Sequence, residues 1–260
     1  MLPIRKRKSI GQHLIKDKEL IERICDLIVY NLPHEEFSFF EIGPGEGNIT
    51  IPLLKKLRNS ENKPSKIILN EIDYRYLKKL KEKIEEEKIN QYFNIEFITQ
   101  EFQKVKFKEK RIFLFGNIPF YITGTVFKKL IQDYDKVVKV VINLQKEVVD
   151  KILNLDNPLG VSFNIGWNIV EGMIIHPSFY DPPPKVFSQI ILLENKHNPL
   201  FCLKFVNFLH KIYRNKKKML KNILTEEEIS KIKDESLLSE RPFNLKVNQI
   251  VQLYENITKC

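Results

Sequence analysis

The chain has 260 residues, of which 43% are hydrophobic and 29% charged, with a formal net charge of +10 and an isoelectric point near 9.3. This composition is typical of a folded globular protein with room for one large and one smaller domain, and it argues against a globally disordered chain. No apolar run is long enough for a transmembrane helix, and the basic N-terminus lacks the apolar segment of a secretory signal.

The basic charge is unevenly distributed. Residues 1–16 contain five Lys or Arg and no acid, and residues 195–222 contain eight and no acid. Two such segments favour a polyanionic partner over a basic surface that only aids solubility. The three cysteines are far apart and form no CxxC motif, so we expect reduced thiols in a cytoplasmic protein, with no disulfide framework and no metal site.

Strands and helices are expected to alternate through the first two thirds of the chain. The apolar runs predict strands at 37–42, 66–70, 94–98, 111–115 and 137–143, with helices at about 47–58, 74–88, 123–133 and 145–153. This alternation indicates an α/β fold with a mainly parallel sheet covered on both faces. Two further strands, 168–175 and 186–194, have no obvious helix between them, which suggests an antiparallel addition at one edge.

From about residue 197 the pattern is helical only, with candidate helices at 199–213, 216–224, 225–233 and 247–257. Thr225 and Glu228 have the spacing of a capping box. We therefore predict two domains: residues 1–196 form the α/β domain, and residues 197–260 form a small helical domain.

Three of the nine glycines lie in "EIGPGEG", where the first strand meets a helix. Gly43, Gly45 and Gly47 allow a ligand to approach the backbone at the edge where doubly wound sheets bind nucleotides. The dinucleotide fingerprint would need glycine at position 48, which is Asn. Glu71 and Glu101 follow the next two strands. There they could accept from a ribose and an adenine amine, although an exposed strand-end acid is as good an explanation of Glu71 taken alone.

The fourth strand ends in "GNIPF" (116–120). The exocyclic amine of a base is a poor nucleophile, because its lone pair is delocalised into the ring. The Asn117 side chain and the Ile118 carbonyl could accept both amine hydrogens and favour a tetrahedral nitrogen. Pro119 holds Ile118 extended, and Phe120 offers a ring for stacking on a flipped base. A turn with a core Phe is the structural alternative.

Taken in order, these motifs resemble the ribosomal RNA adenine N6-dimethyltransferases. The matching stretches are "IGQHLIKD", "EIGPGEG", "NEID", "GNIPF", "QKEV" and "FYDPPPKVFS", over about residues 5–255. The resemblance implies an S-adenosylmethionine-dependent enzyme with a Rossmann-like domain and a helical RNA-binding C-terminal domain. It implies cofactor contacts from Gln12, His13, Leu14, Gly43, Gly45, Glu71, Glu101 and Asn117, catalysis by Asn117, Ile118, Pro119 and Phe120, and Phe179 near the target base.

Three features depart from the family pattern. Glu101 replaces the usual Asp, Phe120 replaces the commoner Tyr, and "NPLGVS" (157–162) lacks the Tyr and basic residue of the family's equivalent loop. These changes bear on the adenine contact, on a phenol hydroxyl and on RNA contacts, respectively.

Within the family, the C-terminal stretches "IYRNKKKMLKNIL" and "ERPFNLKV" resemble the enzyme that dimethylates two adjacent adenosines near the 3′ end of small-subunit rRNA. We expect a monomer that acts on an immature small subunit and binds RNA through Arg214, Lys216, Lys217 and Lys218. The alternative interpretation of this cluster is the solvent-exposed end of a helix. Other functions stay open: a large-subunit enzyme conferring macrolide resistance, a relative of mitochondrial transcription factors, a non-catalytic assembly factor, or a small-molecule or protein N-methyltransferase.

Overall fold

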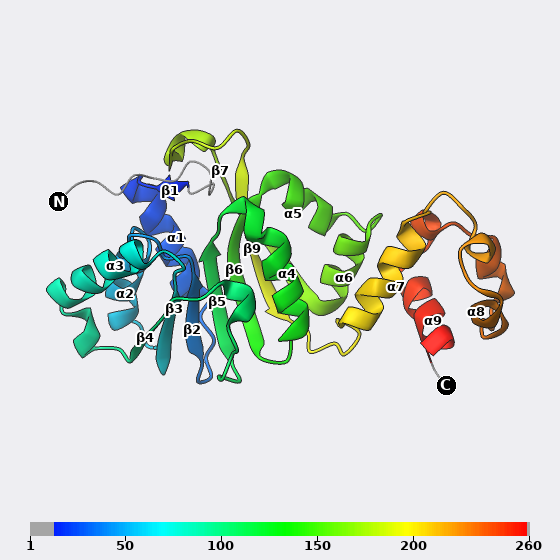
Figure 1. The fold of residues 1–260 in the computed structure, drawn as a ribbon, viewed down its shortest axis with the longest axis horizontal. Coiled ribbons are helices and arrows are strands. Elements are labelled where there is room, and N and C mark those ends of the chain that lie inside the picture. Colours follow the sequence, from blue (N-terminus) through cyan, green and yellow to red (C-terminus); the bar gives the residue numbers. More distant parts are fainter. Residues whose placement is uncertain (1–12, 259–260) are drawn as a thin grey trace. The chain divides into compact units, whose positions relative to one another are not determined.

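The first part of the chain is built on a seven-stranded sheet in the order β4-β3-β2-β5-β6-β9-β7 (Figure 1). The structure is a computed structural model that describes residues 13–258. The strands are β2 (Ser38–Ile42), β3 (Lys66–Asn70), β4 (Ile95–Ile98), β5 (Ile112–Asn117), β6 (Val137–Gln145), β7 (Trp167–Ile175) and β9 (Ser188–Asn195). The strands from β4 to β6 pair in parallel, whereas β9 pairs antiparallel with β6. The expected α/β fold and its antiparallel addition are confirmed.

The parallel strands β2, β3 and β5 are largely buried because helices cover the sheet, whereas the edge strand β4 is only partly buried. All five residues of β2 are buried, as expected for a strand with both faces covered. The helices that alternate with these strands are α1 (Lys18–Tyr30), α2 (Thr50–Arg58), α3 (Tyr74–Glu86) and α4 (Thr123–Gln132). Each turns an apolar stripe inward; on α3 this stripe is Tyr76, Leu77, Leu80 and Ile84.

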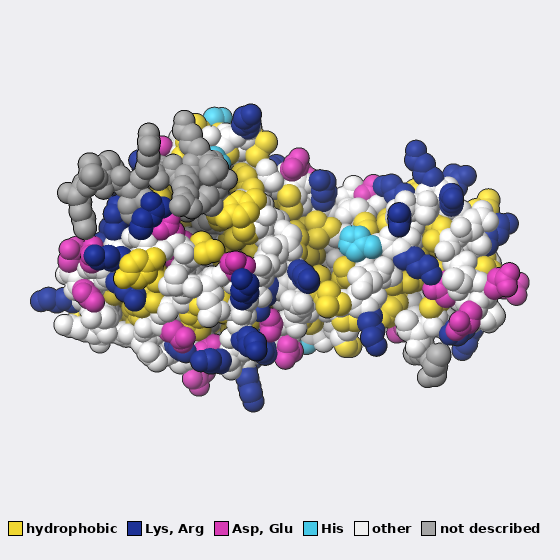
Figure 2. Space-filling model, in the orientation of Figure 1, with side chains coloured by type: hydrophobic (Ala, Val, Ile, Leu, Met, Phe, Trp, Pro, Cys, Tyr) yellow, Lys and Arg dark blue, Asp and Glu magenta, His cyan; other side chains and the backbone are white. Residues whose placement is uncertain are grey.

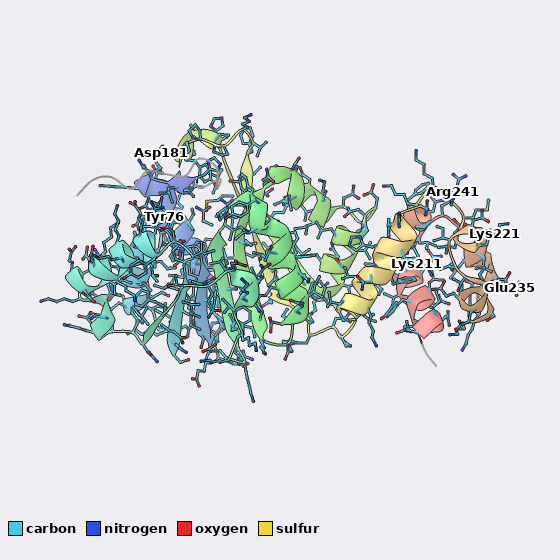
Figure 3. All side chains as sticks on the ribbon, in the orientation of Figure 1. Tyr76, Asp181, Lys211, Lys221, Glu235 and Arg241 are labelled. Carbon is cyan, nitrogen blue, oxygen red and sulfur yellow. The ribbon has the colours of Figure 1, made fainter. Side chains whose placement is uncertain are left out.

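A second, two-stranded sheet joins segments that are far apart in sequence. The strands β1 (Leu14–Ile15) and β8 (Tyr180–Asp181) pair antiparallel, with Ile15 opposite Tyr180. The Lys16 ammonium forms an ion pair with Asp181, which is labelled on β8 in Figure 3. The N-terminal motif and the Pro-rich motif are therefore neighbours in space.

The described part of the chain divides into two compact units, one of residues 13–146 and 168–195, the other of residues 147–167 and 196–258. The second unit contains α5 (Lys146–Leu153), α6 (Pro158–Gly166), α7 (Leu203–Tyr213), α8 (Glu226–Ser230) and α9 (Val247–Thr258). Short 3-10 turns lie between α7 and α8 and between α8 and α9. Its core combines Val161 and Ile165 of α6 with apolar residues of α7 and α9. Residues 147–167, placed in the first domain from sequence, thus group with the C-terminal helices.

The seven 3-10 turns in the described part of the chain are η2 (Ile89–Gln91), η3 (Phe102–Lys104), η4 (Phe120–Ile122), η5 (Pro177–Phe179), η6 (Leu220–Asn222), η7 (Glu235–Ser239) and η8 (Pro242–Asn244). The predicted helix at 216–224 is wrong, because only η6 forms there. Helices α1 and α6 are not among the elements expected from the sequence. The capping box is confirmed, since Thr225 and Glu228 each accept a hydrogen bond from the other's backbone N–H.

Candidate active site

A cavity of about 300 Å³ opens at the carboxyl ends of the parallel strands β2, β3, β4 and β5. Its walls contain most of the site residues expected from sequence, and all of them belong to the first unit. The predicted residues that line it are His13, Leu14, Gly43, Gly45, Glu71, Glu101, Asn117, Ile118, Pro119 and Phe120. Gln12 lies outside the described residues. The fold therefore brings five stretches that are separate in the sequence to one cavity.

The glycine loop after β2 forms one wall. Gly43 and Gly45 have φ values of +67° and +57°, a backbone conformation that favours glycine. A side chain at Gly43 would extend into open space, so the backbone itself faces the cavity. At Gly45 an added Cβ would lie 3.4 Å from a Leu14 methyl group, which shows how closely the N-terminal motif packs on the loop.

Glu71 follows β3 and is 4% exposed. Its Oε2 accepts from the Gly45 N–H at 3.0 Å, and its Oε1 accepts from the Asp73 N–H at 2.9 Å. Burial raises the pKa of this carboxyl above its ordinary value, although the two backbone donors oppose the shift. The carboxyl group is thus fixed in orientation beside the glycine loop.

Glu101 lies at the same cavity but in a different setting. Its side chain is 44% exposed, its Oε2 accepts from Gln103 Nε2 at 2.7 Å, and its Oε1 forms an ion pair with Lys104 at 3.1 Å. The hydrogen bond from Gln103 and then the contact with Lys104 lower the pKa of Glu101. Glu101 is therefore an exposed, ionised rim residue, whereas Glu71 is a buried wall residue.

The "GNIPF" stretch ends β5 and turns into α4. A Cβ at Gly116 would lie only 2.7 Å from Ile118 Cγ2, so the close packing of the Ile118 side chain requires glycine there. Pro119 has φ −59° and ψ 134°, and the Phe120 carbonyl accepts from Thr123 Oγ1 at 2.8 Å. These contacts hold half-buried Asn117 and Phe120 in the cavity wall.

The rings of His13, Phe120 and Tyr180 line the cavity near the pairing of β1 with β8. The His13 ring lies between those of Phe120 and Tyr180, with centroid distances of 6.1 and 6.4 Å. His13 Nδ1 is 2.6 Å from the Pro182 carbonyl oxygen, so this nitrogen carries the proton. Tyr180, not the neighbouring Phe179, lines the cavity: Tyr180 is 5% exposed and Phe179 39%. The sequence reasoning missed Tyr180, one position away.

Sequence reasoning also missed Asn143, near the end of β6. It lies opposite Asn117 in the parallel pair and is 2% exposed. Its Nδ2 donates to Asn117 Oδ1 at 2.7 Å. The available signal was a polar residue directly after the apolar stretch "VVI" (140–142).

The predicted RNA-binding residues follow α7 in the second unit. Arg214, Lys217 and Lys218 are exposed, whereas Lys216 is partly buried and makes an ion pair with Asp156 at 3.7 Å. Figure 2 shows Lys and Arg side chains gathered along the upper edge of the C-terminal helical part. Exposed Lys221 and Arg241, labelled in Figure 3, belong to the same unit.

Among residues 13–258, no group of three or more His, Cys, Asp or Glu side chains is arranged to hold a metal ion. Among the described helices, none has the length and apolar character needed to cross a membrane.

Comparison with known proteins gives a consistent result. The family model for ribosomal RNA adenine dimethylase matches residues 4–259. A protein of Mycoplasma mobile named ribosomal RNA small subunit methyltransferase A is 30% identical, covering 87% of this chain and 86% of its own. A protein of the same name from a Sulfurihydrogenibium species is 31% identical, covering 89% of each.

Two solved structures share the fold. A dimethyladenosine transferase from Plasmodium falciparum has a TM-score of 0.76 at 22% identity, covering 93% of this chain and 96% of its own. The 23S rRNA methyltransferase ErmE has a TM-score of 0.66 at 17% identity, covering 95% of this chain and all of its own. Because the family model extends over nearly the whole sequence, the chain belongs to the ribosomal RNA adenine dimethylase family.

Proposed function

We propose that this protein transfers methyl groups from S-adenosylmethionine to N6 of two adjacent adenosines near the 3′ end of small-subunit rRNA. The observation that carries the proposal is the single cavity that collects the glycine loop, Glu71 and the "GNIPF" stretch. The names of the relatives from Mycoplasma mobile and Sulfurihydrogenibium support the choice of the small subunit.

The cavity fits the cofactor in its chemistry. The open backbone at Gly43 suits close approach of the methionine part, and Glu71 suits the ribose hydroxyls because its carboxyl group is already oriented. Glu101 at the rim is the candidate for the adenine amine, with its carboxylate shared with Gln103 and Lys104. His13 and Leu14 would cover the cofactor from the side of β1.

S-adenosylmethionine supplies an activated methyl group on a sulfonium ion. The chain's own residues prepare the acceptor. Asn117 Oδ1 and the Ile118 carbonyl accept the two N6 hydrogens of adenosine, which directs the nitrogen lone pair toward the methyl group. Pro119 restricts Ile118 to an extended backbone, and Phe120 stacks on the base. The methylated nitrogen is acidic while it carries positive charge, so it can lose its proton to water without a strong base.

Ribosomal RNA, within an immature small subunit, is the proposed partner, and the protein would act on it as a monomer in the cytoplasm. Arg214, Lys217 and Lys218 are the proposed phosphate contacts, since all three are exposed in the acid-free segment after α7. Phe179 is also exposed and stays a candidate for contact with RNA near the target base.

The test uses small subunits from a strain that lacks the adenosine modification. The purified protein and S-adenosylmethionine are added, and the mass of the 3′ fragment of the rRNA is measured. We expect four added methyl groups on two neighbouring adenosines. Methylation of large-subunit rRNA instead would support the resistance enzyme, and absence of cofactor binding would support a non-catalytic assembly factor.

A further inference from the structure

The buried carboxamide of Asn143 contacts two residues of the cavity wall at once. Its Nδ2 donates to Asn117 Oδ1 at 2.7 Å and to the Tyr180 hydroxyl at 2.6 Å. The Tyr180 hydroxyl lies 2.6 Å from Ser188 Oγ, to which it can donate its own hydrogen. Both hydrogens of the Asn143 amide are therefore used, one by Asn117 and one by Tyr180.

The backbone fixes this arrangement. Asn117 and Asn143 are partners in the parallel ladder of β5 and β6, so their side chains leave the sheet on the same face. Tyr180 is held by its pairing with Ile15, and Ser188 is opposite Gln145 on β6. Residues of β5, β6, β8 and β9 thus form one chain of hydrogen bonds that passes through the Asn143 NH2 group.

Asn143 is a poor choice for stability alone. Its Oδ1 is buried and has no hydrogen-bond partner among residues 13–258. A buried acceptor without a partner costs free energy, and an apolar side chain would avoid that cost. This points to a role for the Nδ2 group at the site.

The oxygen and nitrogen ends of an asparagine amide are almost equal in size, so only its hydrogen-bond partners decide which end faces a given direction. An inverted Asn117 would present N–H donors to a substrate amine, which also carries N–H donors. We propose that Asn143 is a positioning residue, which fixes Asn117 with its oxygen available to the adenosine N6. One lone pair of Oδ1 accepts from Asn143, and the second is left for the substrate.

This inference rests on the proposed role of Asn117. It predicts that loss of Asn143 lowers methyl transfer while leaving the binding of cofactor and RNA intact. Asn143→Ala removes both donors. Asn143→Leu removes them with a branched side chain that keeps the site filled, so a folded variant is available even where Ala leaves a cavity.

Asn195 provides the matched control. It is also a buried β-strand asparagine of the first unit, 7% exposed, and its Nδ2 donates to the carbonyls of Tyr134 and Val137 at 2.7 Å. It lies at the opposite end of β9 from Ser188 and does not line the cavity. Asn195→Ala should lower the unfolding temperature with unchanged turnover.

The experiment measures kcat on undermethylated small subunits, the Kd of S-adenosylmethionine and the unfolding temperature. For Asn143→Ala and Asn143→Leu we expect kcat to fall at least about tenfold, with the Kd changed by less than about twofold. Because Asn143 acts through Asn117, Asn117→Ala combined with Asn143→Ala should be no slower than Asn117→Ala alone.

Two outcomes overturn the inference: wild-type kcat in Asn143→Leu, or losses that multiply in the double variant. If Asn117→Ala itself retains wild-type turnover, the proposed catalytic site is wrong, which is a different failure. If Asn117→Ala is inactive while Asn143→Leu is fully active, only the positioning role is wrong.

Discussion

The Glu71 carboxyl group accepts a hydrogen bond from the backbone N–H of Gly45 at 3.0 Å, across 26 positions of sequence. Its other oxygen accepts from Asp73 N–H. Glu71, which follows β3, and the glycine loop, which follows β2, are therefore held together by a hydrogen bond. A cofactor that binds the loop and the acid would meet a site that is already assembled.

Glu71→Gln should weaken cofactor binding. Both carboxylate oxygens accept from backbone N–H groups, so a Gln amide would set its NH2 against one of them. Loss of a charge-assisted hydrogen bond is worth about 10- to 100-fold in Kd. Calorimetric titration with S-adenosylmethionine measures the change. Glu86→Gln, an exposed acid at the end of α3, is the control and should bind as wild type. Equal affinity in both variants would remove Glu71 from the site.

Asn117→Ala should retain cofactor and RNA binding but lose methyl transfer. The Asn117 side chain is the proposed acceptor for an amine hydrogen of the substrate. Its removal should therefore raise the barrier to methyl transfer without weakening binding. Removal of one preorganised polar group of this kind costs about 100- to 1,000-fold in kcat. Single-turnover transfer of labelled methyl groups to small-subunit rRNA gives the rate. A rate within about threefold of wild type would contradict the mechanism.

Local patterns were enough to predict much of the site. Runs of apolar residues predicted the strands, and the residues that follow each strand end, from Gly43 to Phe120, line one cavity as parallel strand ends must. The functional roles of these residues stay predictions. What the sequence could not show is pairing across long separations.

Tyr180 and Asn143 are examples of that limit. Tyr180 reaches the cavity because β8 pairs with β1, a partner about 165 residues away. Asn143 lies opposite Asn117 because of the register between β5 and β6. That register shifts at an irregularity between Ile112 and Phe113, which the sequence does not reveal. At "NPLGVS", Asn157 caps α6 by accepting from the Gly160 N–H, so a stretch interpreted as a loop begins a helix.

Replacing Arg214, Lys217 and Lys218 with Gln should weaken RNA binding and reduce its salt dependence. Each lost phosphate contact should lower the slope of log affinity against log salt by about 0.7 to 0.9. Titrations of rRNA fragments at several salt concentrations give the slope. Lys216→Gln should change it less, because Lys216 already pairs with Asp156. Lys63→Gln, an exposed loop lysine, is the control. An unchanged slope in the triple variant would place RNA binding elsewhere.

Glu41 should make the stability of the protein depend on pH. It is 3% exposed, Thr50 donates to its Oε1 at 3.0 Å, and its Oε2 has no hydrogen-bond partner among the described residues. Burial raises its pKa from 4.5 to about 8. The folded state therefore keeps this proton up to about pH 8, whereas the unfolded state loses it near pH 4.5. The free energy of unfolding should fall as the pH rises between these values, by at most about 1.4 kcal/mol per unit.

Glu41→Gln isolates this contribution, because the neutral amide resembles the protonated acid and can still accept from Thr50. Urea unfolding of the cofactor-free protein at several pH values between about 5 and 8 gives the free energy of unfolding for each variant. The decline from pH 5 to pH 8 should be smaller in Glu41→Gln than in wild type. Glu86→Gln should keep the wild-type decline, since that acid is exposed. The same decline in all three proteins would show that Glu41 does not hold its proton in the folded state.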